Sequence, residues 1–433
     1  MLKSTLEQQE IIYSEDKTIF VPALAGTGKT ATLVDYTKLH KQDRVLCLFY
    51  NQSMKLSAIG RFPERVDIFT YHGMARQECK DYNVSDIDLS KISELTGLSI
   101  KESFQLNNLL NSFFNSDLDS ILKLNSPLVD YAELIWNKMI NKEIDLTHDA
   151  YLKMYQLSKP DLSKYDIILI DEAQDLSAVM IDIINQQDKP TKIFVGDINQ
   201  QIYAFRGTVN IFNNIKTRYK LTQSFRFGQK IADVANIILE QKKSKEKLKG
   251  FANVDSEVFS DSSFENIQKT HIFRTNTALF LKAVELIESG KEVYIIGAEN
   301  IFSRLENALN LYENKPIVKD KYMETFKNFY ELKGVSSIIP EFKFIVKLIE
   351  SFGPSLRDYI KEFKKASYKN AEHVLVTAHK SKGLEFLYTK IENDFIPIQN
   401  ASIEELNLLY VAVTRATYYL EINNDLKKYY KFN

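Results

Sequence analysis

Short apolar runs recur along the chain and end in polar residues, which is the pattern of strands buried in a parallel sheet. In the first half of the chain these runs are Thr18–Val21, Arg44–Tyr50, Val66–Thr70, Tyr165–Ile170 and Thr191–Val195. In the second half they are Thr270–Arg274, Glu292–Gly297, His373–Ala378 and Tyr418–Ile422. Helical patterns separate the runs, so the sequence predicts an α/β protein with mostly parallel strands.

Two long stretches carry helical spacing and no strand run. Residues 81–143 are rich in Leu, Ile, Phe, Asn and Ser, and residues 299–368 are rich in Phe, Lys and Glu. We interpret both as helical insertions, with Trp136 as a core residue of the first. A helix is also expected near Leu6, capped by Ser4 or Thr5.

Composition limits the class of protein. A chain of 433 residues is too long for one small core, so about two to four domains are expected. Hydrophobic residues make up 44% and charged residues 26%, as in soluble globular proteins. Since 56 basic residues balance 57 acidic ones, a polyanion feels no whole-molecule attraction, and any nucleic-acid contact must come from a local groove.

The cysteine count and the absence of long apolar runs point to the cytoplasm. Cys47 and Cys79 are too few for a disulfide framework and suit a reducing compartment as inert thiols. No apolar run reaches ~18 residues and no signal peptide is visible. We therefore expect a cytoplasmic protein without a membrane contact.

The segment from Ala23 to Thr30 is a glycine-rich turn between a predicted strand and a predicted helix. Such a turn directs backbone N–H groups at an anion, which predicts that phosphates bind there. Lys29 would reach the β- and γ-phosphates, and the Thr30 hydroxyl would ligate Mg²⁺. Ala23 replaces the first glycine of the usual pattern, and a chance glycine-rich turn is the alternative.

Two carboxylates, Asp171 and Glu172, directly follow the strand that ends at Ile170. A carboxylate at a buried strand end is costly unless it meets a cation or hydrogen-bond donors. Beside a phosphate loop, Asp171 would hold Mg²⁺ and Glu172 would orient and deprotonate the attacking water. The alternative is an ordinary solvated acidic turn. Gln200, after the next strand, would sense the γ-phosphate.

Aromatic and basic residues follow in two further segments. Tyr203, Phe205 and Arg206 offer rings and a guanidinium for bases and backbone. Phe225 would stack on adenine and Arg226 would reach the γ-phosphate, while the Gln8 amide suits the adenine edge.

These motifs, in this order, resemble the UvrD/Rep-like superfamily 1 DNA helicases, and among them the F-box DNA helicases. The resemblance covers nearly the whole chain and rests on Thr147–Leu152, Phe194–Gly207, Leu221–Gly228 and Thr377–Phe386. Because no segment before Gln8 could hold an F-box, we expect the helicase core alone, without a ubiquitin-ligase role. Phe205 stands where UvrD and Rep have Trp, and Phe225 where many relatives have Tyr.

The resemblance implies two RecA-like P-loop motor domains, each with a helical insertion and the second insertion short. Motor domain 1A would comprise 1–80 and 146–220, with insertion 1B at 81–145. Motor domain 2A would comprise 221–298 and 369–433, with a reduced insertion 2B at 299–368.

The resemblance also implies roles for individual residues. The catalytic set would be Lys29, Asp171, Glu172, Gln200, Arg226 and Arg415. The nucleotide would be bound by Gln8, Ala25, Gly26, Thr27, Gly28, Lys29, Thr30, Phe225, Arg226, Glu385 and Arg415, and Mg²⁺ by Thr30 and Asp171. Single-stranded DNA would be contacted by Phe49, Asn51, Thr70, His72, Tyr203, Phe205, Arg206, Arg274, Asn276 and His379.

The implied function is an ATP-dependent 3′–5′ translocase or helicase of the DNA repair and recombination type, which couples hydrolysis in the cleft between domains 1A and 2A to stepping. ATP and Mg²⁺ would be its cofactors, with single-stranded DNA, duplex junctions and other DNA-processing proteins as partners. We expect a monomer or a transient assembly. Two alternatives stay open, a motor subunit of a larger nuclease or defence complex and an ATP-gated DNA-binding switch that does not travel.

Overall fold

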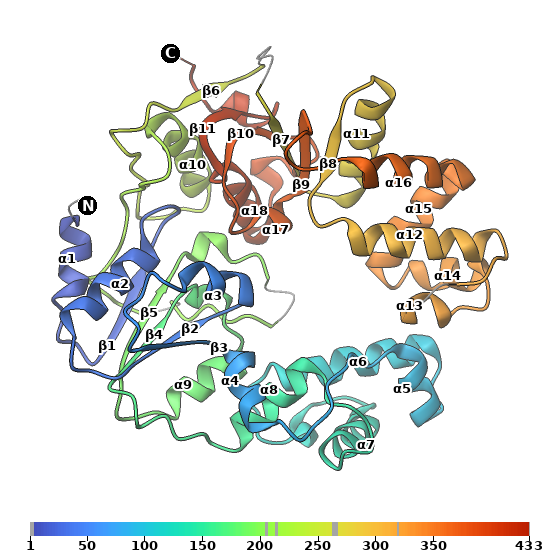
Figure 1. Ribbon diagram of the computed structural model, residues 1–433, viewed down its shortest axis with the longest axis horizontal. Coiled ribbons are helices and arrows are strands. Elements are labelled where there is room, and N and C mark those ends of the chain that lie inside the picture. The colour runs from blue at the N-terminus through green and yellow to red at the C-terminus, as the bar shows by residue number, and fades with distance from the viewer. Residues whose placement is uncertain (1–3, 204–206, 213–214, 262–266, 318–319, 433) are drawn as a thin grey trace. The chain divides into compact units, whose positions relative to one another are not determined.

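The fold is taken from a computed structural model, which describes residues 4–203, 207–212, 215–261, 267–317 and 320–432. The chain forms two compact units. The first unit comprises Met1–Ile87, Gln105–Ala232 and Lys242–Val254, and the second comprises Asp88–Phe104, Asp233–Gln241 and Asp255–Asn433. Each contains a parallel sheet with flanking helices, so the predicted α/β class with two parallel sheets is confirmed (Figure 1).

The first unit is built on a five-stranded parallel sheet. Its strands, in spatial order, are β1 (Thr18–Pro22), β5 (Thr191–Gly196), β4 (Ile167–Ile170), β2 (Val45–Phe49) and β3 (Val66–Thr70). Every residue of β2 and β4 is buried, as expected for central strands covered on both faces. Since β1, β5 and β4 are neighbours and parallel, the loops at their carboxyl ends meet at one edge of the sheet.

Short helices precede or connect these strands. They are α1 (Leu6–Ile12), α2 (Lys29–Leu39), α3 (Gln52–Ala58), α4 (Tyr71–Glu78), α8 (His148–Leu157) and α9 (Ala178–Asn185). The Thr5 side chain accepts a hydrogen bond from the Gln8 backbone and caps α1, as predicted. Apolar residues of α1, α2 and the strands form a common core, for example Ile11, Leu33 and Cys47, each with 0% of its surface exposed.

The first stretch with helical spacing is helical in the structure. It contains α5 (Leu89–Thr96), α6 (Ile100–Phe114) and α7 (Val129–Ile140). Trp136 of α7 packs against Phe113 and Phe114, with ring centroids 5.8 and 5.4 Å apart. Only 6% of Trp136 is exposed, which confirms its predicted place in the core.

The second unit contains a six-stranded parallel sheet. The strands, in spatial order, are β6 (Glu257–Phe259), β11 (Ala416–Glu421), β10 (Phe386–Ile391), β7 (Lys269–Phe273), β9 (His373–Thr377) and β8 (Val293–Ile295). The sequence pattern predicted four of these and missed β6 and β10. Because β10 lies between β11 and β7, the second omission concerns the centre of the sheet.

The remaining helices include those of the second predicted insertion. They are α10 (Gln229–Gln241), α11 (Asn276–Glu288), α12 (Glu299–Tyr312), α13 (Lys321–Glu324), α14 (Phe329–Ser336), α15 (Pro340–Phe352), α16 (Leu356–Lys365), α17 (Ala378–Ser381) and α18 (Ile403–Val413). The domain limits given above stay a prediction. Within the described ranges, no helix has both the length and the apolar composition needed to cross a membrane.

A chain of three titratable side chains joins neighbouring strands of the second sheet. His271 Nδ1 lies 2.6 Å from Glu392 Oε1, and His271 Nε2 lies 2.8 Å from His373 Nδ1. His271 is buried, with 3% of its surface exposed. Burial, with a further contribution from His271, lowers the pKa of His373 from the usual 6.5 to about 4.

This pKa predicts a stability loss of the second unit in mild acid. Between pH 6.5 and 4 the unfolded chain binds a proton at His373 that the folded chain does not, so stability falls as pH falls. His373→Asn should reduce the loss between pH 7 and 4.5 by about 1 kcal/mol, allowing for solvent screening. Urea midpoints at both pH values measure this, with His40→Asn of the first unit as control. Equal losses in His373→Asn and wild type would contradict the prediction.

Candidate nucleotide-binding site

The turn between β1 and α2 has the backbone of a phosphate loop. Gly26 and Gly28 have φ values of 71° and 76°, in the left-handed region that favours glycine. A Cβ atom on Gly26 would lie 2.6 Å from Ser224 Oγ, so a side chain does not fit. The Thr27 hydroxyl donates to the Leu24 carbonyl at 2.8 Å and closes the turn. The helix α2 therefore begins at Lys29, with its first N–H groups at the loop.

Two side chains at the start of α2 meet the two carboxylates that follow β4. Thr30 Oγ1 donates to Asp171 Oδ2 at 2.6 Å, and Lys29 Nζ lies 3.4 Å from Glu172 Oε1. Asp171 is 2% exposed, while the Lys29 and Glu172 side chains are 11% and 17% exposed. The structure thus brings together the four residues that the sequence assigned to phosphate, metal and water.

Burial sets the ionisation of this cluster. Burial, together with the charge of Glu172, raises the pKa of Asp171 to about 6. Burial also raises the pKa of Asp197 at the end of β5. For Lys29, burial opposes the charge, but the carboxylates of Glu172, Asp197 and Asp171 outweigh it and raise the pKa. Lys29 therefore stays protonated at neutral pH and faces three acidic groups.

Glu172 has an unusual backbone and a second hydrogen-bond partner. Its φ of 54° lies in the left-handed region, which non-glycine residues seldom adopt and which often marks a functional site. Glu172 Oε2 accepts a bond of 2.7 Å from Gln174 Nε2, and the same nitrogen lies 3.3 Å from Asp175 Oδ2. Gln174 Oε1 accepts a bond of 2.9 Å from the Asp197 N–H. One buried amide therefore links the ends of β4 and β5.

Gln200 is held by Asp197, whose role the sequence did not indicate. Gln200 Nε2 donates to Asp197 Oδ2 at 2.8 Å, and both residues are buried. The other oxygen of Asp197 accepts from the Asn199 N–H at 2.9 Å. The position of Asp197 directly after a predicted strand, like that of Asp171, was the signal that could have found it. Gln174 and Asp197 thus orient Glu172 and Gln200.

Residues 221–226 cover the phosphate loop. The Leu24 N–H donates to the Leu221 carbonyl, and the Phe225 N–H donates to the Gly26 carbonyl. The charge of Arg226 acts on Lys29 and opposes its protonation. Residues 221–232 belong to the same unit as the loop, although the sequence assigned them to the second motor domain.

Gln8 and Phe225 flank the same glycine. A Cβ atom on Gly28 would lie 3.1 Å from Gln8 Nε2 and 3.5 Å from the Phe225 ring. The Gln8 amide donates to Thr32 Oγ1 at 3.2 Å and accepts from the Thr5 N–H at 2.9 Å. The two residues predicted to contact adenine are therefore neighbours of the phosphate loop, with Gln8 oriented by α1 and α2.

Glu385 and Arg415, also predicted to contact the nucleotide, belong to the second unit. Arg415 is 1% exposed, and its Nε donates to the Val411 carbonyl at 2.9 Å. A second guanidinium nitrogen donates to the carbonyl of Leu384, the neighbour of Glu385, at 3.2 Å. Glu385 itself is exposed. Arg415, after the end of α18, therefore lies beside the turn before β10 that carries Glu385.

The predicted DNA contacts of the first unit divide into buried and accessible residues. Phe49 is 2% exposed and packs edge-on against Phe62, and its role as a DNA contact stays a prediction. Thr70 is 6% exposed, and its hydroxyl accepts from the Gly73 N–H as the cap of α4. Asn51 is exposed at the start of α3.

Tyr50, the next residue after Phe49, was not among the predicted contacts. Its ring lies parallel to that of Tyr203, with an interplanar angle of 13° and centroids 6.1 Å apart. Tyr50 and His72 line the same cavity in the first unit. Phe49 belongs to β2, whose residues are all buried, whereas Tyr50 follows the strand and is partly exposed.

The other predicted DNA contacts lie in the second unit or outside the described residues. Arg274 makes a bidentate ion pair with Glu405, with both bonds 2.6 Å long. Asn276 is exposed as the first residue of α11, and His379 is partly exposed on α17. Phe205 and Arg206 lie outside the described residues.

The donor set suits a hard divalent cation shared with phosphate oxygens. Within the described ranges, no group of three or more His, Cys, Asp and Glu side chains could hold a metal alone. The Thr30 hydroxyl and the Asp171 carboxylate are oxygen ligands of the kind Mg²⁺ prefers, and the raised pKa of Asp171 reflects a buried carboxylate that a cation would stabilise. Bound there, Mg²⁺ would neutralise charge on the phosphates.

Comparisons with known proteins agree with this geometry. A family model described as an AAA domain matches residues 8–206. F-box DNA helicase protein 1 of Schizosaccharomyces pombe and F-box DNA helicase 1 of Gallus gallus are 29% and 28% identical to the chain over 98% of its length. A probable DNA helicase II homolog of Mycoplasma pneumoniae is 26% identical over 92% of the chain and 80% of its own length.

The chain is thus similar over more than nine-tenths of its length to proteins named as DNA helicases. It spans 58% of the yeast relative and 49% of the chicken relative. The similarity includes the part of the chain that carries the phosphate loop and the strand-end carboxylates.

The raised pKa of Asp171 predicts that its charge destabilises the nucleotide-free fold. Because the folded pKa lies above the usual 3.8, stability is lost as pH rises through about 6, and the penalty is present at pH 7.5. Asp171→Asn should raise the free energy of unfolding by about 1–3 kcal/mol at pH 7.5 without Mg²⁺. Thermal unfolding measures this.

Asp161→Asn is the matched control, because Asp161 is exposed and hydrogen bonds to Ser163 lower its pKa. This control should not gain stability. An Asp171→Asn variant no more stable than wild type would mean that Lys29 and Thr30 already compensate the buried charge.

Proposed function

We propose that the chain is an ATP-dependent DNA helicase of the repair or recombination type, which steps 3′ to 5′ along a single strand and unwinds duplex or displaces bound protein. The observation that carries this proposal is the pairing of Lys29 and Thr30 with Glu172 and Asp171 at the end of a parallel sheet. The names of the relatives support DNA as the substrate.

Each group of this cluster has a task in phosphoryl transfer. Lys29 holds the β- and γ-phosphates, Glu172 orients and deprotonates the attacking water, and Gln200 senses the γ-phosphate. The carboxylate of Glu172 acts as the base, and Gln174 and Lys29 fix its two oxygens in place. Arg226 and Arg415 stabilise the charge that develops in the transition state.

Gln174 supplies a route by which a strand could stimulate hydrolysis. Its Nε2 contacts both Glu172 and Asp175, and Asp175 lines the large cavity of the first unit. A strand in that cavity would change the hydrogen bonding of Asp175 and, through one amide, the position of Glu172. The predicted division into domains 1A, 1B, 2A and 2B is part of the same proposal.

Lys29→Ala should abolish DNA-stimulated ATP turnover. Loss of one group that stabilises transition-state charge lowers the rate on the order of 10²–10³-fold, and Lys29 Nζ lies 3.4 Å from Glu172 Oε1. Steady-state phosphate release with and without a DNA strand measures the effect. Lys38→Ala is the control, because Lys38 lies on the same helix but is exposed and pairs with Asp35. Wild-type turnover in Lys29→Ala would sink the site assignment.

Forked duplexes with a single 3′ or 5′ tail test the direction of translocation and whether the chain unwinds DNA without a partner protein. The purified chain should unwind only the fork with a 3′ tail, and its ATPase should rise with strand length because a walking motor reaches the end of a short strand sooner. Length-dependent ATPase without unwinding would indicate a motor that needs a partner. ATPase independent of strand length would contradict translocation and favour a switch.

A further inference from the structure

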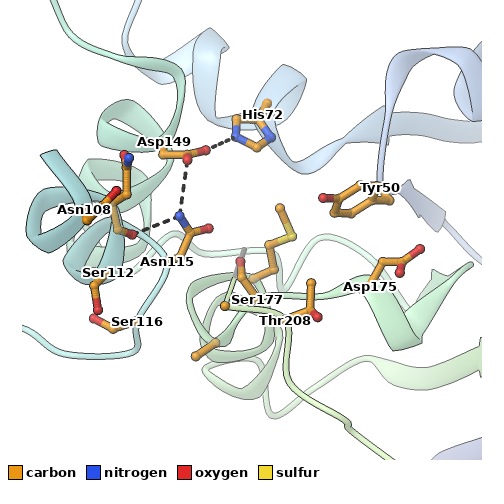
Figure 2. A pocket seen from close by; sticks show the side chains of 14 residues that line it. Tyr50, His72, Asn108, Ser112, Asn115, Ser116, Asp149, Asp175, Ser177 and Thr208 are labelled. Carbon is orange, nitrogen blue, oxygen red and sulfur yellow. Dashed lines mark hydrogen bonds and ion pairs between the residues drawn. The ribbon is translucent and has the colours of Figure 1, made fainter. Parts of the chain in front are cut away.

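The first unit contains a cavity of about 890 Å³, which is within the usual range of small-molecule sites, about 300–1,000 Å³. Its walls come from α6, the start of α9 and the segments that follow β2 and β3 (Figure 2). The lining residues are Tyr50, His72, Asn108, Asn111, Ser112, Asn115, Ser116, Asp149, Asp175, Ser177, Ala178, Met180, Gly207 and Thr208.

The charge of this lining does not suit phosphate. Among the described residues that line the cavity none is Lys or Arg, and Asp149 and Asp175 contribute carboxylates. Phosphate contacts in nucleic-acid complexes come mainly from basic side chains and backbone N–H groups. A strand in this cavity would therefore keep its phosphates away from the walls and turn its bases toward them.

One face of α6 carries uncharged polar side chains along the cavity. Asn108, Asn111, Ser112 and Asn115 follow the spacing of three and four residues that aligns side chains on a helix. Asn115 Nδ2 donates to the Asn111 carbonyl at 3.0 Å and to Asp149 Oδ2 at 3.2 Å. Its Oδ1 consequently points away from both partners and toward the cavity, as Figure 2 shows. The cavity thus contains an oriented acceptor.

Ser177 gives an independent sign of a ligand. It is 3% exposed, and its hydroxyl has no hydrogen-bond partner among the described residues. It is the N-cap residue of α9, but its side chain makes no capping hydrogen bond. Figure 2 shows the hydroxyl directed to the space beside Asn115. Buried polar groups are nearly always paired, so a partner is expected from a bound molecule.

We infer that this cavity binds the bases of a single strand by their edges and prefers bases with an exocyclic amino group. The inference rests on the proposed function, because it takes the strand as ligand. Asn115 Oδ1 and the carboxylate of Asp149 accept hydrogen bonds, and cytosine N4 donates them. Thymine and uracil present an acceptor, O4, at the same place and would face like groups. Tyr50 supplies a flat wall for stacking.

Homopolymers that differ in one group test the preference. Fluorescence anisotropy would compare oligo(dC), oligo(dU) and oligo(dT) of equal length at fixed salt, because salt alone shifts such affinities. Oligo(dC) should bind at least about fivefold more tightly than oligo(dU), the size expected of one discriminating base contact. Oligo(dU) and oligo(dT) should bind alike, since only the methyl group separates them.

Ser177→Ala locates the preference in the cavity. The variant should lose about half or more of the preference for oligo(dC), because one hydrogen-bonding group is removed. Its unfolding temperature should be unchanged or higher, because the hydroxyl is unpaired in the free protein. Ser256→Ala is the matched control, since Ser256 is also buried with an unpaired hydroxyl but does not line the cavity. This control should keep the full preference.

The outcomes separate this inference from the proposed function. Equal affinity of the wild-type chain for oligo(dC) and oligo(dU) overturns the inference, even if every strand stimulates ATPase. An unchanged preference in Ser177→Ala overturns the assignment to this cavity. If no strand binds or stimulates ATPase, the proposed function fails and the inference fails with it.

Discussion

A buried ammonium facing three acidic groups organises the first unit. Lys29 lies where β1, β4 and β5 end side by side, and Asp171, Glu172 and Asp197 follow those strands. Burial, with a further contribution from the charge of Glu172, raises the pKa of Asp171, although Lys29 opposes this rise. A further cation at this place would stabilise the charged form of Asp171. A divalent ion that arrives with a nucleotide would supply that charge.

Much of this site was predictable because residues that follow neighbouring parallel strands lie together at one edge of the sheet. Once Thr18–Val21, Tyr165–Ile170 and Thr191–Val195 are identified as strands, the groups after them must converge. The supporting contacts were not predictable in the same way. Gln174 and Asp197 act through hydrogen bonds that depend on how two strand ends pack, and Arg226 lies in the same compact unit as the loop, which no motif could indicate.

The errors also have physical causes. Strand β10, Phe386–Ile391, mixes Thr and Lys with apolar residues, so its pattern lacks the continuous apolar run that marked the other central strands. Strand β6 is only three residues long, Glu257–Phe259, too short for a periodic signal. Phe49 was named as a DNA contact from the resemblance, although the apolar run Arg44–Tyr50 predicted a strand buried on both faces. In a strand buried on both faces, however, alternation gives no outward side, and the first ring free to leave the sheet is Tyr50.

The two regions of the first unit differ in charge, and one amide connects them. The phosphate loop offers N–H groups and an ammonium, which suit phosphates. The cavity offers hydrogen-bond acceptors and an aromatic ring, which suit bases. Gln174 has little freedom between them, because its Oε1 is bonded to Asp197 and its backbone carbonyl accepts from Gln201. A planar amide fixed at one end can change partners at the other only by rotation or displacement. If a base draws Asp175 away from Gln174 Nε2, the hydrogen bond from Nε2 to Glu172 becomes stronger. Thermodynamic linkage then requires that a ligand that acts on Glu172 change the affinity for the base by the same free energy.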